Sequence, residues 1–208
     1  KGNSTKNMFI TKKNHLRKIK RVRIPEDRDL INGLRLNRNE KVENWGGKIV
    51  SEIFKNKPDW YLSTYPDSST LYEKLSKHLN IDSSKIMLTS GMDGGIRTLY
   101  EIITEPGDIV GVPGPTYAMY YVYSKLFQTN LTEIQYSPTS LKLDWQQLYN
   151  FIDSKPSMLF LPNPNQPVED ALNKDQIVDI AKRAYKNNTL FVVDEAYFMF
   201  GCESVIDL

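Results

Sequence analysis

Apolar positions along this chain switch between two spacings from about residue 41 onward. Clusters that repeat every three or four residues, such as Leu71, Leu75 and Leu79, are typical of one helix face, whereas short continuous apolar runs are typical of buried strands. Helices are predicted after a cap at 68–70, at 93–105, from Pro115 to about 127, at 144–152 and at 174–186. Strands are predicted at 85–90, 108–113, 131–136, 157–161 and 190–193. This alternation predicts an α/β fold with a mainly parallel sheet flanked by helices.

Residues suited to ligand binding follow four of the predicted strands. They are Ser90-Gly91, Pro113-Gly114-Pro115, Pro162-Asn163-Pro164 and Asp194. The carboxyl ends of parallel strands lie at one edge of a sheet, and α/β proteins bind ligands in the crevice there. We therefore expect these segments to line one site.

Asp194 ends an apolar, β-branched run that predicts a central strand, and Tyr197 follows three residues later. An aspartate in this place can pair with a positively charged ring nitrogen, and a nearby tyrosine can donate to a ring oxygen. Pyridoxal phosphate needs both contacts, because its protonated pyridine ring is the electron sink in carbanion chemistry.

Three further segments carry compatible chemistry, each beside a simpler structural explanation. The turn at 89–95 offers backbone N–H groups to an anion, although its glycines could serve the turn alone. Tyr117 follows Pro115 in the first turn of a helix and could either stack on a flat ring or be a core tyrosine. The loop at 162–167 contains three prolines and three side-chain amides, so it is stiff and rich in hydrogen-bonding groups.

Composition limits the class of protein without naming it. With 208 residues and 40% hydrophobic content, the chain is long enough to bury a core. Its single Cys202 allows no internal disulfide and fits a reducing compartment. No apolar run approaches a membrane span and no signal-peptide pattern opens the chain, so we expect a cytoplasmic protein with no membrane partner. His15 and His78 lie far apart in the sequence, which argues against a metal site.

Basic residues gather at the N-terminus. Residues 1–23 contain nine Lys and Arg and no acidic residue, which leaves 18 basic against 25 acidic residues in the remainder. Such an arm can bind nucleic acid or an anionic membrane. We favour a solvated extension that packs on the acidic body or on a partner subunit, because no aromatic interleaving or nucleic-acid motif accompanies the charge.

Five segments together resemble the fold-type I pyridoxal-phosphate aminotransferases of class I/II, and within them the histidinol-phosphate aminotransferase branch. They occur in the family's order, at approximately its spacing, from about Leu34 onward. The segments are Tyr65-Pro66-Asp67, Thr89-Ser90-Gly91-Met92-Asp93, Pro115-Thr116-Tyr117, Asn163-Pro164-Asn165-Gln166-Pro167 and Asp194-Glu195-Ala196-Tyr197. We expect a basic N-terminal arm at 1–33 from its charge, and the resemblance implies part of the family's large cofactor domain at 34–208.

The resemblance also implies a role for each motif. Backbone amides of Met92 and Asp93 would hold the cofactor phosphate. Tyr117 would stack on the pyridine ring, Asp194 would pair with its nitrogen, and Tyr197 would bond its phenolic oxygen.

Tyr65 looks like the tyrosine that these enzymes extend across a dimer interface to the neighbour's phosphate, which implies a homodimer. The substrates implied are a small-molecule amine and a 2-oxo acid, and the implied setting is biosynthesis. The family's substrate-side segment ends in Asn-Glu-Asn-Pro, whereas this chain reads Asn39-Glu40-Lys41-Val42. The substrate therefore does not follow from this segment.

Gln166 departs from the family pattern Asn-Pro-Asn-Asn-Pro-Thr-Gly. It replaces the asparagine that bonds the cofactor's phenolic oxygen, and Val168-Glu169 replaces Thr-Gly. Glutamine could make this bond with a shifted backbone, or Asn163 could substitute for it. The change suggests a divergent branch with another substrate, such as an amino sugar or polyol derivative.

The family's Schiff-base lysine follows a serine and precedes a Gly-rich segment. Ser-Lys pairs occur here at 76–77, 84–85, 124–125 and 154–155, but none precedes such a segment. We therefore expect the chain to be the N-terminal portion of a longer enzyme, with the small domain largely absent, no catalytic lysine of its own and little turnover alone.

Other interpretations stay open. The strand before Asp194-Glu195 also fits an NTPase, but the phosphate loop that this requires is missing. The chain could instead be a truncated or degenerate non-catalytic module for binding or dimerisation. A decarboxylase of the same fold is a further alternative.

Overall fold

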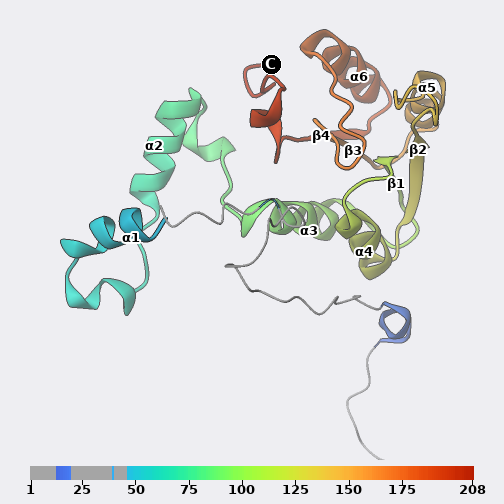
Figure 1. Cartoon of the computed structure of the whole chain (residues 1–208). Coiled ribbons are helices and arrows are strands. Elements are labelled where there is room, and N and C mark those ends of the chain that lie inside the picture. Colours follow the sequence, from blue (N-terminus) through green and yellow to red (C-terminus); the bar gives the residue numbers. More distant parts are fainter. Residues whose placement is uncertain (1–12, 20–38, 40–45) are drawn as a thin grey trace, which may run out of the picture. The chain divides into compact units, whose positions relative to one another are not determined.

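A computed structural model describes residues 13–19, 39 and 46–208 (Figure 1). The chain divides into two compact units, one from residues 1–20 and 87–208 and the other from residues 21–86. Most of the predicted arm at 1–33 lies outside the described residues. Within the part of the arm that is described, residues 14–18 form the short 3-10 helix η1 (Asn14–Lys18). The division into an arm at 1–33 and a domain at 34–208 therefore stays a prediction.

The larger unit is built on a four-stranded parallel sheet, as the sequence pattern predicts. Its strands are β1 (Ile109–Gly114), β2 (Asn130–Gln135), β3 (Met158–Pro162) and β4 (Leu190–Asp194). They lie in the order β2-β1-β3-β4, and every pair is parallel. The sequential strands are linked by helices, which is the arrangement that parallel pairing requires.

Helices cover both faces of this sheet (Figure 1). They are α3 (Gly91–Ile103), α4 (Ala118–Phe127), α5 (Trp145–Asp153) and α6 (Lys174–Lys186). Alternate residues of β3 enter different cores: Met158 and Phe160 pack with α3 and α4, whereas Leu159 and Leu161 pack with α5 and α6. This alternation follows from the two-residue period of a strand. It explains why the whole run is apolar, since both faces of β3 are buried.

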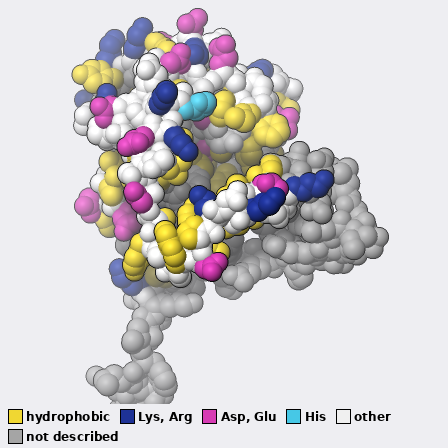
Figure 2. Space-filling model, turned by 90° about the vertical axis from the view of Figure 1, so that its left-hand side faces the viewer, with side chains coloured by type: hydrophobic (Ala, Val, Ile, Leu, Met, Phe, Trp, Pro, Cys, Tyr) yellow, Lys and Arg dark blue, Asp and Glu magenta, His cyan; other side chains and the backbone are white. Residues whose placement is uncertain are grey.

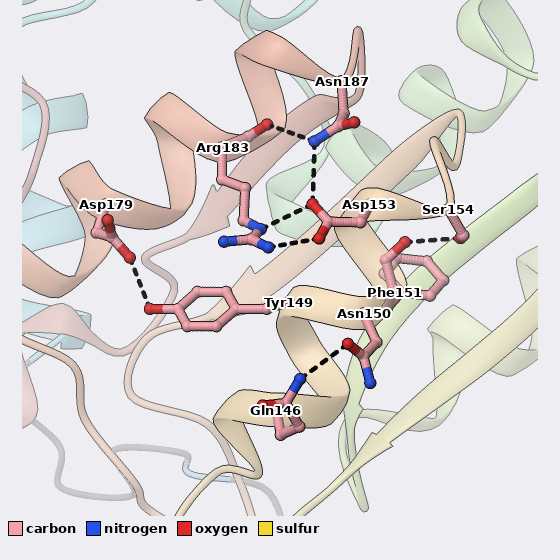
Figure 3. A network of polar contacts seen from close by, with 9 residues as sticks. All are labelled: Gln146, Tyr149, Asn150, Phe151, Asp153, Ser154, Asp179, Arg183 and Asn187. Atoms are coloured by element: carbon pink, nitrogen blue, oxygen red, sulfur yellow. Dashed lines mark hydrogen bonds and ion pairs between the residues drawn. The ribbon is translucent and has the colours of Figure 1, made fainter.

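Polar contacts join α5 and α6 on the outside of the sheet (Figure 3). Tyr149 donates to Asp179 at 2.6 Å. Arg183 donates two hydrogen bonds to Asp153, from Nε to Oδ1 and from Nη2 to Oδ2. The Arg183 guanidinium also lies over the Tyr149 ring, 4.6 Å from its centroid. Asn187 donates to Asp153 as well, at 3.3 Å.

Three expectations about the strands and helices are wrong. Residues 85–90 form no strand: Ile86 is extended (φ −108, ψ 133), but no described strand pairs with this segment. The helix predicted from Pro115 begins at Ala118, because residues 115–117 form a loop with Tyr117 as the N-cap. The strand before Asp194 is an edge strand of the described sheet, not a central one. Apolar composition reports burial of a strand's faces, not the presence of a neighbour on each side.

The described part of the smaller unit contains α1 (Gly46–Lys55), η2 (Asp59–Leu62), α2 (Ser69–Leu79) and η3 (Ser83–Lys85). The predicted helix that carries Leu71, Leu75 and Leu79 is confirmed as α2. None of these elements has a buried residue, and large apolar side chains are exposed on them. These side chains include Ile49, Val50, Ile53, Phe54, Trp60 and Leu62. Figure 2 shows hydrophobic side chains exposed beside charged ones on one face of the molecule.

No helix in the described ranges combines the length and the apolar character needed to cross a membrane.

Candidate functional site

Asp194 is a buried carboxylate at the carboxyl end of β4. Its backbone carbonyl accepts a hydrogen bond from the Asn163 N–H at 2.8 Å, which ties the end of β4 to the loop after β3. The side chain accepts two hydrogen bonds, one from the Ala196 backbone N–H to Oδ1 at 3.0 Å and one from the Tyr120 hydroxyl to Oδ2 at 2.5 Å. Asp194 is only 7% exposed.

The side-chain partners of Asp194 that the structure describes are both neutral. Across residues 13–19, 39 and 46–208, no Lys, Arg or His forms an ion pair with Asp194. Buried carboxylates in folded proteins are normally paired or strongly hydrogen-bonded, because the loss of hydration is costly. A ligand that carries a positive charge would complete the set of partners.

Tyr120 is a site residue that the sequence reasoning missed. It lies on α4, is fully buried, and packs its ring 4.9 Å from the ring centroid of Phe160. Burial, and next the neighbouring Asp194 carboxylate, raise the pKa of the Tyr120 phenol far above its ordinary value, so the phenol stays protonated and donates. The signal was available: Tyr120 lies three residues after Tyr117, and in the helix predicted from Pro115 two side chains at this spacing would meet.

Tyr117 and Asp93 lie beside this pair. The Tyr117 hydroxyl is 3.4 Å from Asp93 Oδ1, and its ring meets that of Tyr120 edge-on with centroids 6.4 Å apart. Burial and the Asp93 carboxylate raise the pKa of Tyr117. Tyr117 is 49% exposed, so one part of its ring faces away from the core. The structure therefore brings Asp93, Tyr117 and Asp194 into one contiguous group linked by Tyr120.

The start of α3 and the turn that leads into it require glycine at two positions. Gly91 has φ +66, a conformation that side chains rarely adopt, and a Cβ on Gly94 would lie 3.2 Å from the Thr89 Cβ. The Thr89 hydroxyl donates to the Gly91 carbonyl at 2.7 Å and closes the turn. Met92 and Asp93 lie in the first turn of α3, where N–H groups have no acceptor within the helix and can face an anion.

Two buried asparagines hold the loop after β3. Asn163 donates to the Leu172 carbonyl at 3.1 Å and accepts from the Leu172 N–H at 2.8 Å. Asn165 accepts from the Thr116 hydroxyl at 2.6 Å and donates to the Pro115 carbonyl at 2.9 Å. The Asn163 amide is therefore engaged in structure, which argues against its replacing Gln166.

The remaining predicted residues are placed less tightly. Gln166 is exposed in the same loop, and Tyr197 is half-buried at the start of η4 (Phe198–Phe200). Tyr197 is among the groups that raise the pKa of Tyr117, after burial and the Asp93 carboxylate. Tyr65 belongs to the smaller unit and is fully exposed, so its part in the site stays a prediction.

In the part of the chain that the structure describes, no group of three or more His, Cys, Asp or Glu side chains is arranged to hold a metal ion.

Comparisons with known proteins point to one family. The family model for aminotransferase class I and II matches residues 35–207. A histidinol-phosphate aminotransferase of Thermoanaerobacter pseudethanolicus is 32% identical over 172 residues, covering 77% of this chain and 45% of that protein. One of Sulfurimonas denitrificans is 33% identical over 164 residues, covering 77% and 41%. The chain thus spans less than half the length of these relatives.

Solved structures show the same fold. Histidinol-phosphate aminotransferase from Sinorhizobium meliloti, in complex with pyridoxal-5'-phosphate, matches with a TM-score of 0.60 and 22% identity over 65% of this chain and 37% of that one. Cystalysin from Treponema denticola, which contains a pyridoxal 5'-phosphate cofactor, matches with a TM-score of 0.63 and 21% identity over 71% and 42%. At these identities the likeness concerns the fold, not the reaction.

Proposed function

The chain belongs to the aminotransferase class I and II family, and we propose that it forms the greater part of the pyridoxal-phosphate site of a transaminating enzyme. The observation that carries this proposal is the buried Asp194 carboxylate, which has two neutral hydrogen-bond donors and no cation among its described partners. A protonated pyridine nitrogen is a flat, singly charged donor that suits this place.

The residues around Asp194 fit the rest of the cofactor. Tyr117 is half-exposed, with a ring suited to stacking on a flat heterocycle, and Tyr197, three residues after Asp194, has a phenol that can donate to a ring oxygen. The N–H groups of Met92 and Asp93 would hold the phosphate at the start of α3. When bound, the protonated ring withdraws electrons from the reacting carbon of an amine substrate.

Contributions from Gln166 and Tyr65 complete the proposed site. Gln166 would donate from the exposed tip of the loop whose base is pinned by Asn163 and Asn165. Tyr65 would reach the phosphate of a second subunit, which makes the working enzyme a homodimer. Its full exposure leaves it available for such a contact.

The reaction we propose is amino transfer between a small amine and a 2-oxo acid. The relatives' names, which are those of aminotransferases, support this class of reaction. Gln166 and Val168 stand where the family pattern has asparagine and threonine, so we propose a substrate other than histidinol phosphate. No Ser-Lys pair here is followed by the family's Gly-rich segment. The 208 residues by themselves would then bind the cofactor without covalent attachment and turn over little substrate.

Binding of pyridoxamine phosphate tests the proposal, because this form of the cofactor needs no lysine. Calorimetric titration of the chain should show saturable binding that Asp194→Asn weakens at least about 100-fold, since the substitution leaves the ring cation without its charged partner. Asp153→Asn is the matched control: it removes the same charge from the surface of α5 and should leave the affinity unchanged. No binding, or equal binding by the parent chain and Asp194→Asn, would contradict the proposal.

Covalent trapping gives a second readout. Incubation with pyridoxal phosphate, reduction with borohydride and peptide mapping should show no stoichiometric adduct on any one lysine of these residues. A single lysine modified in full would show that the catalytic lysine is present after all.

A further inference from the structure

Tyr120 has a structural relation to Asp194 that the family resemblance does not assign. We propose that Tyr120 is a positioning residue, which holds Asp194 by Oδ2 and so sets the direction in which the carboxylate meets the ring nitrogen. This inference rests on the proposed function, because it concerns how the same carboxylate is presented to the cofactor.

The first argument is the geometry of the carboxylate. Aspartate χ2 is a broad torsion, so a carboxylate without fixed partners samples many orientations. Here the Ala196 N–H holds Oδ1 at 3.0 Å and the Tyr120 hydroxyl holds Oδ2 at 2.5 Å, one donor on each oxygen. The two contacts fix the plane of the carboxylate. An ionised carboxylate accepts about four hydrogen bonds, so lone pairs remain for a ligand.

The second argument is that Tyr120 is itself held firmly. Its ring packs against those of Phe160 on β3 and Tyr117, the N-cap of α4, at 4.9 and 6.4 Å between centroids. The phenol is therefore positioned by ring contacts with the sheet and with the residue that caps α4. The Tyr100 hydroxyl lies 3.4 Å from the backbone carbonyl oxygen of Tyr120, too long for a strong hydrogen bond, so it adds little to this positioning.

The third argument concerns the choice of partner. The Tyr120 hydroxyl lies next to the strand-end carboxylate and donates across 74 residues of sequence. A fixed donor of this kind orders the site before the ligand arrives, so less ordering remains to be done on binding. Tyr120 also contacts the rings of Tyr117 and Phe160, so it connects these aromatic side chains to the Asp194 carboxylate.

Tyr120→Phe is the test substitution, and Tyr100→Phe is its matched control. Both remove one buried hydroxyl from the same aromatic cluster, but only Tyr120 contacts Asp194. The measurements are the Kd for pyridoxamine phosphate and the NMR chemical shift of its ring nitrogen, labelled for that purpose. The chemical shift reports how far the ring nitrogen is protonated, which a purely structural role for Tyr120 would not alter.

We expect Tyr120→Phe to raise the Kd about tenfold, the effect of one hydrogen bond to a charged group. The ring-nitrogen signal should move toward that of the neutral ring, because the reoriented carboxylate stabilises the cation less well. Tyr100→Phe should leave both readouts as in the parent chain. The inference is overturned if Tyr120→Phe matches the parent chain in both, or if the two variants change them equally.

Failure of the underlying function looks different. If the parent chain binds no pyridoxamine phosphate, the proposed function fails and the inference falls with it. If the parent chain binds and Asp194→Asn does not, the function stands and the Tyr120 variants decide the inference alone.

A measurement on the unsubstituted chain covers the case in which Tyr120→Phe does not fold. The hydroxyl proton of Tyr120 should exchange slowly with water, and its NMR signal should shift when pyridoxamine phosphate is added, because both groups then share one carboxylate. A signal that stays in place at saturating ligand would overturn the inference.

Discussion

Two tyrosine–aspartate hydrogen bonds of nearly equal length lie in different surroundings. Tyr149 donates to Asp179 at 2.6 Å on the outside of α5 and α6, and Tyr120 donates to Asp194 at 2.5 Å in the interior. The outer pair has Arg183 over the Tyr149 ring (Figure 3), whereas the described partners of Asp194 include no cation. The same chemical pair is thus exposed beside an arginine in one place, and buried with neutral described partners in the other.

The difference teaches where function is to be sought. The outer network contains more polar groups (Figure 3), but exposed charge pairs are screened by water and contribute little to stability. A buried carboxylate is costly unless something compensates it. A buried carboxylate whose described partners are neutral is therefore a better indication of a site than the number of polar contacts.

The largest effect should come from removing the aromatic support of the inner pair. Phe160→Ala deletes a fully buried ring that packs against Tyr100 and Tyr120, and should lower the free energy of unfolding by about 3–5 kcal/mol. Urea unfolding monitored by circular dichroism measures this. Phe200→Ala, whose ring is 79% exposed, should change the stability little. Equal losses of stability for the two variants would show that Phe160 contributes no more to the core than the exposed Phe200 does.

An intermediate effect is expected from the loop that carries Gln166. Asn165→Ala removes a buried amide and leaves the Thr116 hydroxyl and the Pro115 carbonyl without this partner, at a cost of about 1–3 kcal/mol. The affinity for pyridoxamine phosphate should fall as well, because the loop then loses its anchor to the start of α4. Asn150→Ala, at an exposed amide in the outer network, is the control for unfolding and binding. If both variants bind and unfold alike, the loop does not depend on Asn165.

The smallest effect should come from the outer pair. Tyr149→Phe removes a hydroxyl that bonds an exposed carboxylate, and surface substitutions of this kind change stability by no more than about 0.5 kcal/mol. Pyridoxamine phosphate should bind as before. Comparison with Tyr120→Phe in the same titrations sharpens the contrast between the two pairs. A larger loss of affinity for Tyr149→Phe would reverse our assignment of structural and functional roles.

Much of the fold follows from local pattern. The apolar run before Asp194 and the three-residue and four-residue spacings of α6 predict their elements closely, because each pattern matches the period of the structure that it forms. The predictions of a strand at 85–90 and of a helix start at Pro115 are wrong. A strand also needs a neighbouring strand to pair with, and the start of a helix also depends on its cap. Neither requirement can be read within a window of a few residues.

The sequence by itself determined the α/β class, the parallel sheet and the strand-end position of Asp194, because these depend on spacing along the chain. Only the tertiary structure decided that Tyr120 reaches Asp194, that Asn163 is engaged with Leu172, and that β4 lies at an edge of the described sheet. The physical reason is that burial and hydrogen-bond partners depend on contacts between residues far apart in sequence. The hydroxyl of Tyr120 and the carboxylate of Asp194 are local neighbours only after the sheet has formed.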